Sequence, residues 1–419
     1  MNNQKKYSAV ILGGGIAGIT TALELARLGQ NVVLVEKTPF FGGRAAHFCC
    51  KATDACQKCG ACLVEERLNA LFMEPRITLM PHTELMEVSR ENGLFRLVLK
   101  KQPEVINPAR CVDCGLCYDE CPAADQGAIL TTGITQNHPR YAVNPKACLY
   151  FQDGSCEVCQ HICPPTAKAI DLTRPAKTIE LIADAVVLAT GYRPSDPKSR
   201  PHYGYGRLPQ IITGFELEER LRNGKGLKGP GGELPRRIAF IQCVGSRDKD
   251  HPYCSQVCCA YTLRLARFLK HRVPEAEVTS FYMDLQEIGR CSLQFQAEAR
   301  REIKVVRALP GDLHAAGAGH VKLRYLEEES GRPAEAEVDL VVLSVGIAPG
   351  EDNPALAAML NTELTPDGFF QAANPGQRSQ TSQPGLFLAG TAEGPRDIAG
   401  CIAQATVTAC QVSRYVNER

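Results

Sequence analysis

The stretch YSAVILGGGIAGITTALELARLGQNVVLVEK, residues 7–37, decides the fold. Its apolar pattern predicts a strand, a helix that ends at Gly29 and a second strand, over 7–12, 20–28 and 32–35. This order is typical of the unit that begins a parallel sheet covered by helices. The chain is therefore expected to be an α/β protein.

A glycine pattern joins the first strand to the helix in the form G-x-G-x-x-G. Gly13 allows the tight turn, Gly15 lets a phosphate approach the backbone, and Gly18 lets the helix pack closely on the sheet. Glu36 ends the second strand, where a carboxylate accepts hydrogen bonds from ribose hydroxyls. The unit predicts a dinucleotide site that comprises Gly13, Gly15, Ala17, Gly18, Glu36 and Lys37.

Later segments favour FAD over NAD as the dinucleotide. A Gly-Gly-Arg turn follows Glu36, a strand over 185–188 ends in Ala-Thr-Gly, and residues 385–390 read GLFLAG. Flavoproteins with two dinucleotide-binding domains carry similar segments, with Asp where Thr391 stands. A helix over 398–412 would direct its N-terminus at the flavin and stabilise negative charge there. The expected contacts are Gly42, Gly43, Arg44, Thr190, Gly191, Gly390, Thr391, Arg396, Asp397 and Ile398.

A second nucleotide-binding-like unit is expected after residue 200. It has a strand over 238–241 and a closing strand over 339–345, but the turn over 242–248 reads QCVGSRD instead of G-x-G-x-x-G. The sequence predicts a domain that keeps the NAD(P)-domain fold without its phosphate cradle.

A ferredoxin-like segment interrupts the first lobe. Its first run is C-x2-C-x2-C-x3-C-P, and its second keeps C-x2-C-x3-C-P after a longer first gap. In the bacterial two-cluster pattern the last cysteine of each run binds the other cluster. The predicted ligands of two [4Fe–4S] clusters are Cys111, Cys114, Cys117 and Cys163 for one, and Cys148, Cys156, Cys159 and Cys121 for the other.

Two smaller cysteine groups leave alternatives open. Cys56, Cys59 and Cys62, with Cys49 or Cys50, fit a third iron–sulfur cluster beside FAD or a set of buried or redox-active thiols. A second group, C-x3-C-C at Cys254, Cys258 and Cys259, precedes a helix over 261–269 whose N-terminus would lower thiol pKa values. That group could bind a cluster, act in redox exchange or only pack, and packing is the favoured interpretation because only three cysteines are near in sequence. Buried structural thiols are expected at Cys243, Cys291, Cys401 and Cys410.

Composition excludes several function classes. The net charge of +1 over 419 residues gives no general attraction to nucleic acid or to an anionic membrane. No apolar run is long enough to span a bilayer, and no secretory signal precedes the first strand. Together with 20 cysteines, most of which cluster at metal-ligand spacing, this predicts a reducing cytoplasmic location.

Several long strings resemble the A subunit of heterodisulfide reductase and the related A subunit of the quinone-interacting membrane-bound oxidoreductase. They include ACLYFQDGSCEVC over 147–159, YGYGR over 203–207, IAFIQCVGSRD over 238–248, YCSQVCC over 253–259 and GTAEGPRDI over 390–398. The resemblance implies a thioredoxin-reductase-like flavoprotein with two dinucleotide-binding domains and an inserted two-cluster bacterial-type ferredoxin domain. The expected divisions are 1–104, 173–200 and 350–419 for the FAD lobe, 105–172 for the insertion and 201–349 for the second domain.

The resemblance also implies a multi-subunit electron-transfer complex. Expected partners are iron–sulfur proteins like the B and C subunits of heterodisulfide reductase, or a membrane protein that reacts with quinone, and a homodimer of this chain is compatible with it. In that family the flavin can bifurcate electron pairs, but Arg396 stands near the flavin N5 edge where some members have Lys. Two alternatives are a self-contained NAD(P)H-dependent oxidoreductase and a redox-sensing scaffold.

Overall fold

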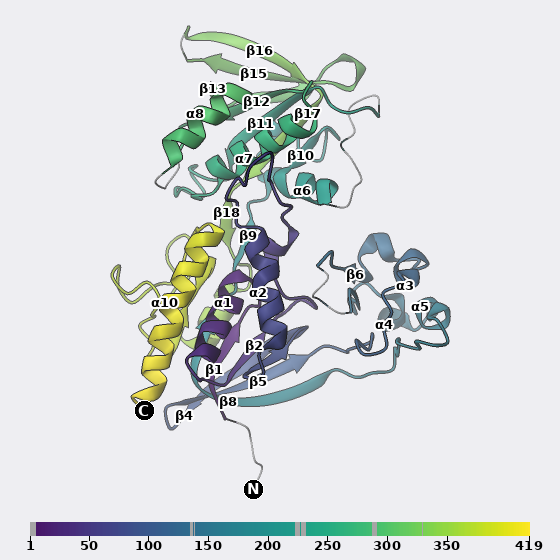
Figure 1. Ribbon diagram of the computed structural model, residues 1–419, viewed down its shortest axis with the longest axis vertical. Coiled ribbons are helices and arrows are strands. Elements are labelled where there is room, and N and C mark those ends of the chain that lie inside the picture. Colours follow the sequence, from purple (N-terminus) through teal and green to yellow (C-terminus); the bar gives the residue numbers. More distant parts are fainter. Residues whose placement is uncertain are drawn as a thin grey trace.

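The computed structural model describes residues 6–134, 137, 139–222, 227, 232–286, 291–328 and 330–419. Two α/β lobes lie one above the other in Figure 1, and a smaller unit projects from the side of the lower lobe. The described chain begins and ends in the lower lobe (Figure 1). We call these parts the first lobe (below), the second lobe (above) and the insertion.

The first lobe is built on a sheet in the order β3-β2-β1-β8-β5-β4, with β19 paired to β8. Its strands are β1 (Lys6–Leu12), β2 (Val32–Val35), β3 (Ile77–Met80), β4 (Thr83–Glu91), β5 (Leu94–Lys101), β8 (Lys177–Leu188) and β19 (Leu386–Leu388). Its helices are α1 (Ile16–Arg27), α2 (Cys62–Met73), α9 (Asn353–Leu360) and α10 (Ile398–Asn417). Residues 9–11 and 185–188 are fully buried because both faces of the parallel strands are covered.

The first unit follows the expected order, with one displaced boundary. The second strand covers the expected residues, whereas α1 begins at Ile16 instead of residue 20. The helix can begin directly after Gly15 because Gly18 lies inside it, where the missing side chain permits contact with the preceding turn. The glycine pattern therefore forms the first turn of the helix as well as the loop before it.

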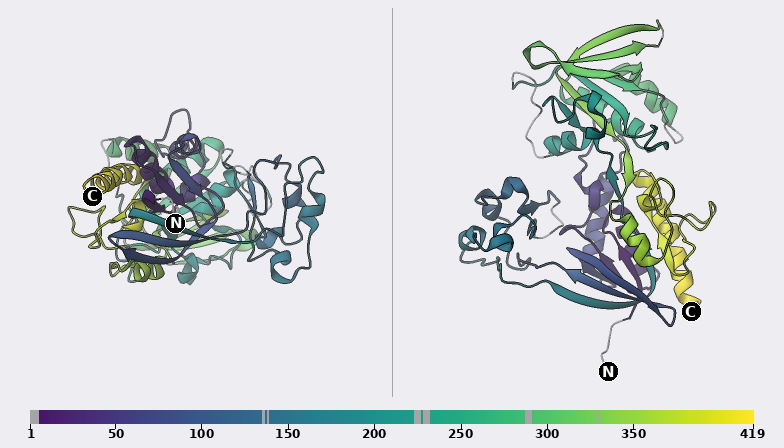
Figure 2. Two further views of the ribbon diagram at one scale, coloured as in Figure 1. Left: turned by 90° about the horizontal axis from the view of Figure 1, so that it is seen from below. Right: turned by 180° about the vertical axis from the view of Figure 1, so that it is seen from behind.

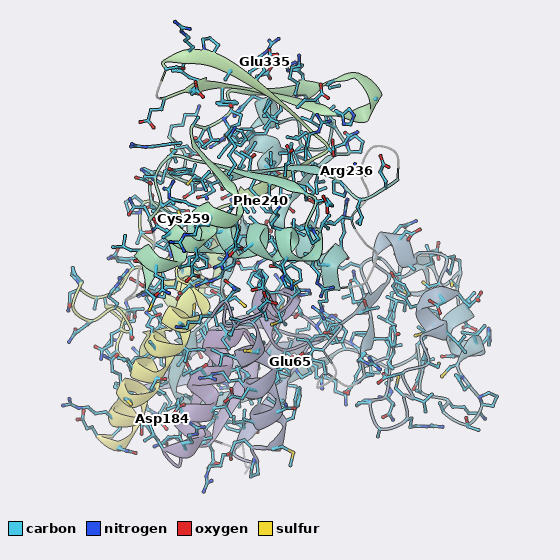
Figure 3. The ribbon with its side chains drawn as sticks, turned by 45° about the horizontal axis from the view of Figure 1, so that its top comes forward. Glu65, Asp184, Arg236, Phe240, Cys259 and Glu335 are labelled. Atoms are coloured by element: carbon cyan, nitrogen blue, oxygen red, sulfur yellow. The ribbon has the colours of Figure 1, made fainter. Side chains whose placement is uncertain are left out.

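The second lobe has a parallel sheet in the order β10-β17-β11-β12-β13 and a separate antiparallel sheet β14-β15-β16. The strands are β10 (Ile211–Thr213), β11 (Arg237–Val244), β12 (Glu277–Tyr282), β13 (Lys304–Arg307), β14 (Asp312–Ala315), β15 (Val321–Glu327), β16 (Arg332–Val338) and β17 (Leu340–Val345). The helices are α6 (Gly214–Arg222), α7 (Cys258–Arg272) and α8 (Ser292–Glu302). Phe240, labelled in Figure 3, lies in the buried core of this lobe.

Two short antiparallel strands connect the lobes. They are β9 (Tyr192–Pro194) and β18 (Ile347–Pro349), and they pair Ile347 with Pro194. The chain leaves the first lobe through β9 and returns through β18 (Figure 1). This crossing brings the end of β8 close to the end of the second sheet.

The insertion joins the first lobe through β5 and β8, which pair antiparallel at its base. It contains β6 (Ile129–Thr131), β7 (Tyr141–Val143), α3 (Leu116–Asp119), α4 (Leu149–Asp153) and α5 (Val158–Ile162). Its own core includes Ile106, Ile129, Cys148, Cys159 and Leu172. Figure 2 shows from two further directions that the insertion projects away from both lobes. No helix among the described residues has the length and hydropathy to cross a membrane.

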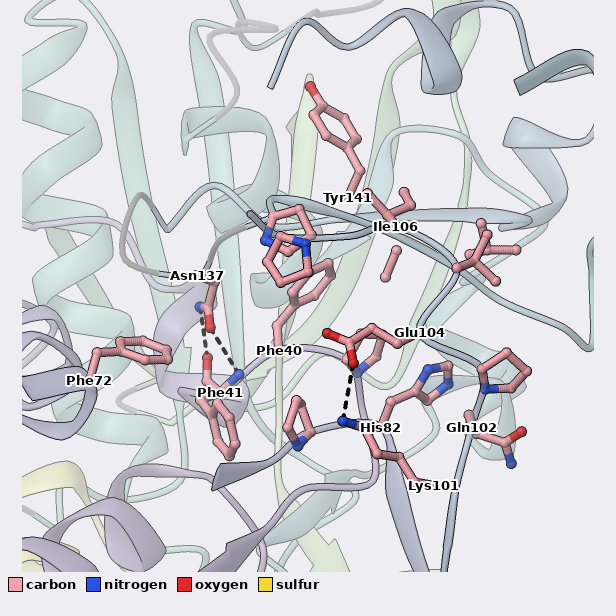
Figure 4. A pocket seen from close by; sticks show the side chains of 18 residues that line it. Phe40, Phe41, Phe72, His82, Lys101, Gln102, Glu104, Ile106, Asn137 and Tyr141 are labelled. Atoms are coloured by element: carbon pink, nitrogen blue, oxygen red, sulfur yellow. Dashed lines mark hydrogen bonds and ion pairs between the residues drawn. The ribbon is translucent and has the colours of Figure 1, made fainter. Parts of the chain in front are cut away.

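One loop of the insertion is fastened to the first lobe. Ile134 belongs to the first lobe's core and not to the insertion's own core. The Asn137 amide accepts from the Phe41 N–H at 3.1 Å and donates to the Phe41 carbonyl at 3.0 Å. Figure 4 shows this pair beside a cavity of about 110 Å³ between the insertion and the first lobe. Phe41 in turn lies against Gly14 in the glycine turn.

Asn137→Ala is expected to loosen the insertion without unfolding it, because it breaks two buried hydrogen bonds and leaves the Phe41 backbone groups unpaired. Proteolysis within residues 101–105 and 172–177 should become several-fold faster, as measured by limited trypsin digestion. Asn144→Ala is the matched control, since Asn144 donates to Gly127 inside the insertion. If residues 101–105 and 172–177 were cleaved equally fast in wild type and in Asn137→Ala, Asn137 would not be what fastens the insertion to the first lobe.

Candidate functional site: a dinucleotide turn and cysteine groups

The glycine turn at the N-terminus of α1 has the shape of a phosphate cradle. A side chain at Gly13 would meet the Ala189 carbonyl oxygen at 2.2 Å, and one at Gly18 would meet the Gly13 carbonyl oxygen at 1.8 Å. A side chain at Gly15 would meet the Gly43 Cα at 3.9 Å, an ordinary van der Waals distance. No side chain among the described residues caps α1 at Gly15. Uncapped helix N–H groups beside glycine backbone suit a pyrophosphate.

The Gly-Gly turn closes over this cradle. The Gly42 N–H donates to the Gly14 carbonyl at 2.8 Å, and a side chain at Gly43 would meet the Gly15 Cα at 2.8 Å. Glu36 fastens the turn from the sheet side, where Oε2 accepts from the Gly14 N–H and Oε1 from the Thr38 N–H, both at 2.7 Å. Burial raises the pKa of Glu36, and the hydrogen bonds from Thr38 and Gly14 oppose that rise. The carboxylate thus fixes the turn.

The ends of β8 and β19 form the other side of the site. A side chain at Gly390 would meet the Ala17 Cβ at 2.5 Å, so β19 ends directly against α1. Arg44 donates from Nε to the Tyr192 carbonyl at 2.8 Å and lies over the Tyr192 ring. Gly191 adopts a left-handed φ of 77°. These contacts gather residues from four distant segments around one space.

Two polar atoms at this site are buried without a hydrogen-bond partner among the described residues. They are Thr190 Oγ1 and Arg396 Nε. Such atoms are costly unless a partner is supplied, and both residues are among the predicted FAD contacts. Arg396 also forms an ion pair with Glu393, and Asp397 caps α10 by accepting from the Gly400 N–H at 2.6 Å. The residues present therefore fit a bound FAD.

Other predicted contacts have partners within the protein. Lys37 forms an ion pair with Asp352 at 2.7 Å, which also raises the pKa of Lys37. Thr391 is buried, and Ile398 packs against Gly60. Lys37 thus ties the end of β2 to the start of α9.

The first set of ferredoxin cysteines surrounds one cavity. Cys111, Cys114, Cys117 and Cys163 line it together with apolar residues such as Ile106 and Ile170. The Ala169 N–H donates to the Cys163 sulfur at 3.3 Å. The structure therefore brings Cys163 across to the first run, as the swapped pattern requires. An apolar cavity with four thiols suits a [4Fe–4S] cluster.

The second set lies next to the first. Burial raises the pKa of Cys159 to about 11, and the nearby thiols of Cys148, Cys121 and Cys156 raise it further. Burial, and then the nearby thiol of Cys159, raise the pKa of Cys117 to about 12. Because Cys117 belongs to the first set and Cys159 to the second, the two sets adjoin. In the described part of the chain no three Cys, His, Asp or Glu side chains converge closely enough for a single metal ion.

Comparison with known proteins agrees with this site. Residues 8–55 match the family model FAD dependent oxidoreductase, and residues 104–124 match the 4Fe-4S binding domain. An iron-sulfur A subunit of the CoB–CoM heterodisulfide reductase of Methanopyrus kandleri is 32% identical over 97% of this chain and 64% of its own length. The A subunit of the H(2):CoB-CoM heterodisulfide,ferredoxin reductase of Methanothermobacter thermautotrophicus is 33% identical over 97% of this chain and 63% of its own length.

Over nearly its whole length this chain is similar to the A subunits of heterodisulfide reductases. It spans a little under two thirds of the length of these relatives. The solved structures of two thioredoxin reductases, from T. acidophilum and Lactococcus lactis, each align with 99% of this chain at 13% sequence identity. The alignments include 99% and 100% of those two chains, and the TM-scores are 0.52 and 0.54. The expected fold class, a thioredoxin-reductase-like α/β flavoprotein with a ferredoxin-type domain, is confirmed.

In the second lobe, Cys243 lies near the expected group of Cys254, Cys258 and Cys259, which the spacing along the chain does not indicate. Cys258 is buried, and burial followed by the thiols of Cys243, Cys259 and Cys254 raises its pKa. Cys243 has its pKa raised to about 12 by burial and then by Cys259. The expected lowering by the helix N-terminus is wrong for Cys258, because desolvation outweighs it. Figure 3 labels Cys259, on α7.

This group is held by a strained and hydrogen-bonded backbone. Cys243 has a left-handed φ of 59°, and the register of β11 shifts between Ile241 and Val244. Ser255 Oγ donates to Ser246 Oγ at 3.0 Å and accepts from the Ile347 N–H at 2.8 Å. A strained residue persists only where the surroundings enforce it. The signal in the sequence is the cysteine at the end of β11, in the turn that lacks the glycine cradle.

Backbone N–H groups also point at two of these sulfurs. The Gln286 N–H donates to Cys259 and the Gln256 N–H to Cys254, both at 3.3 Å. Hydrogen bonds to sulfur are one means by which proteins adjust cluster potentials.

The cysteines over 49–62 occupy a loop between the lobes. The Cys49 N–H donates to Glu218 at 2.8 Å, and burial and then Glu218 raise the Cys49 pKa to about 12. The Gln57 carbonyl accepts from Arg264 on α7 at 2.8 Å. Cys50, Cys56 and Cys62 are exposed, and Cys59 is half-buried. The cluster proposed at Cys50, Cys56, Cys59 and Cys62 stays a prediction.

Two cysteines expected to be buried are exposed. Cys291 immediately precedes α8 and Cys410 lies on α10, both with exposed side chains, whereas Cys401 is buried as expected. A helix buries only one face, and Cys410 falls on the exposed face of α10.

Cys243→Ser is expected to remove about four irons per chain, since one ligand of a four-iron cluster is lost. Iron and acid-labile sulfide analysis of anaerobically purified protein would measure the loss. Cys410→Ser is the control, because Cys410 is exposed on α10. Iron content equal to that of wild type would assign the four thiols to packing.

Proposed function

We propose that this chain passes electrons between FAD and [4Fe–4S] clusters within a multi-subunit complex like heterodisulfide reductase. The observation that carries the proposal is the presence of a dinucleotide cradle and adjoining four-thiol sets in one chain. Bound FAD would exchange electrons in pairs, whereas each cluster would exchange them singly.

The residues of the first lobe have distinct tasks in this proposal. The N-terminus of α1 and the Gly42–Gly43 turn would hold the pyrophosphate. Thr190 Oγ1 and Arg396 Nε would find their partners on the bound dinucleotide. The guanidinium of Arg396 would place a positive charge at the flavin.

The clusters would provide a route away from the flavin. We assign one to Cys111, Cys114, Cys117 and Cys163, a second to Cys121, Cys148, Cys156 and Cys159, and a third to Cys243, Cys254, Cys258 and Cys259. The third would lie near the flavin site. Tyr192 contacts Arg44, and its hydroxyl interacts electrostatically with the thiols of both Cys258 and Cys401.

The partner class follows from the family. The matched relatives are named as A subunits of heterodisulfide reductases, so we propose that other subunits carry the terminal chemistry here as well. The turn over 242–248 lacks the glycine cradle, and Cys243 occupies part of it. Electrons would therefore enter through a partner and not through bound NAD(P)H.

Anaerobic purification tests the proposal directly. We expect stoichiometric FAD, about 12 irons if three [4Fe–4S] clusters are present, and dithionite-induced cluster signals in electron paramagnetic resonance. NADPH alone should bleach the flavin no faster than buffer. A protein with neither flavin absorbance nor iron would refute the proposal, and rapid bleaching by NADPH would favour a self-contained reductase.

A further inference from the structure

A buried carboxylate lies between two arginines beside the predicted flavin contacts. Glu393 Oε1 accepts from Arg378 Nε at 2.8 Å, and Glu393 Oε2 accepts from Nη2 of Arg396. The Glu393 side chain is 7% exposed, whereas Arg378 is 56% exposed and Arg396 is 17% exposed. Charge-assisted hydrogen bonds on both oxygens stabilise a carboxylate that is almost removed from water. The three side chains therefore form one charged unit, in which Glu393 is the buried centre.

The backbone that carries the outer arginine is fastened to the first lobe. Gln404 on α10 accepts from the Gly390 N–H at 2.8 Å and donates to the Arg378 carbonyl at 3.3 Å. The Leu388 N–H donates to the Ser379 carbonyl at 3.0 Å, which ties the same segment to β19. Arg378 thus reaches the buried carboxylate from a fixed backbone.

The inner arginine of the unit faces the dinucleotide site. Arg396 directly precedes Asp397, the N-cap of α10, and this helix begins where the two lobes meet (Figure 1). Burial raises the pKa of Cys401 to about 12 and the charge of Arg396 opposes that rise, so the two side chains are close. A side chain at Gly390, the end of β19, would meet the Cys401 sulfur at 3.6 Å. Nε of Arg396 is buried without a partner among the described residues, while Glu393 holds Nη2.

We propose that Glu393 is a positioning residue, which aims the Arg396 guanidinium at the bound flavin and offsets part of its positive charge. This inference rests on the proposed function. A positive charge beside the flavin favours the reduced ring, which carries more negative charge than the oxidised ring. A carboxylate that is hydrogen-bonded to the arginine opposes this effect. Removal of the carboxylate's charge should therefore make the flavin easier to reduce.

A role in fastening the chain would depend on charge in a different way. If Glu393 only tied Arg378 to the end of β19, a substitution at either residue would disturb the fold similarly. If Glu393 offsets the charge of Arg396, loss of the carboxylate and loss of Arg378 have opposite electrostatic effects on the flavin. Arg378 is also more exposed, so water and salt screen its charge more strongly. The sign of the change in flavin potential thus separates the two roles.

The test is a redox titration of the anaerobically purified full chain. Dithionite supplies two electrons to each flavin and water supplies the proton, while mediator dyes report the potential. The variant is Glu393→Gln, which has nearly the same shape but no charge. The matched control is Glu335→Gln in the second lobe, because Glu335 also binds two cations, Lys322 at 3.0 Å and Arg324 at 2.8 Å.

Glu393→Gln should shift the reduction equilibrium of the flavin about tenfold toward the reduced form, which is about 30 mV for a two-electron couple. Arg378→Gln should shift it little or in the opposite direction, and Glu335→Gln should leave it unchanged. Glu393→Asp keeps the charge, so its flavin potential should stay closer to that of wild type. The cluster potentials, followed by electron paramagnetic resonance in the same titration, should match wild type in all these variants.

An unchanged flavin potential in Glu393→Gln would overturn the inference. An equal rise in Glu393→Asp or in Arg378→Gln would overturn it too, because the carboxylate would then act through the fold and not through its charge. If Glu393→Gln does not retain FAD, the decision falls to Arg396→Gln, which removes the positive charge. A flavin potential that does not fall in Arg396→Gln would then overturn the inference.

The two proposals fail in different ways. A wild-type protein without FAD would remove the proposed function. A wild-type protein that binds FAD, but whose flavin potential ignores the charge of Glu393, would remove only this role of Glu393.

Discussion

Gly18→Ala is expected to weaken FAD binding about tenfold or more. The added methyl group would lie 1.8 Å from the Gly13 carbonyl oxygen and 3.3 Å from the Ala189 Cβ. Both α1 and the turn are backbone held by the sheet, so no flexible side chain can move aside. Overpacking costs about 1–3 kcal/mol, and each ~1.4 kcal/mol at the site is about tenfold in affinity. We therefore expect flavin affinity to fall about tenfold or more, measured by titrating apoprotein with FAD.

A matched glycine separates this effect from glycine loss in general. Gly311→Ala adds the same methyl group where no described atom lies within 4 Å. The control should bind FAD as wild type does. Both variants should keep their iron, because the insertion has its own core. If Gly18→Ala bound FAD as tightly as wild type, the cradle would not be the dinucleotide site.

The second large effect concerns the exchange of ligands between the two cysteine runs. Cys163→Ser should disable the cluster held with Cys111, Cys114 and Cys117, because it removes the fourth thiol of that cavity. Cys121→Ser should instead disable the cluster held with Cys148, Cys156 and Cys159. Each variant should lose up to about four irons.

The two variants differ in which signal survives, and this makes the assignment testable. Redox titration followed by electron paramagnetic resonance should show one ferredoxin cluster lost in each variant, and a different one in each. Cys291→Ser is the control, since its exposed thiol lies outside the insertion. If both variants lost the same cluster, the exchange between the runs would be refuted.

Local sequence accounts for much of the first lobe. Residues 32–35 form the expected strand, and Gly13, Gly15 and Gly18 form the expected turn. These features depend on neighbours in the chain: a glycine is needed where the backbone is crowded, and an apolar run is buried on both faces. The predicted start of α1 falls four residues late, because the glycines inside its first turn resemble loop residues by propensity.

The site required contacts between distant segments. Asn137 binds Phe41 across 96 residues, and Ile134 of the insertion fills the first lobe's core. No local pattern marks either residue, because a polar amide and an apolar side chain in a loop have many possible partners. The anchoring of the insertion beside the glycine turn is therefore a tertiary result.

The chain by itself determined the glycine cradle and the two ferredoxin runs, because short-range spacing fixes a turn or a loop that presents thiols. Only the tertiary structure decided that Cys243 lies near Cys254, Cys258 and Cys259. The end of β11 and the start of α7 meet only once the parallel sheet has formed. Long-range packing, and not spacing along the chain, makes a site of such residues.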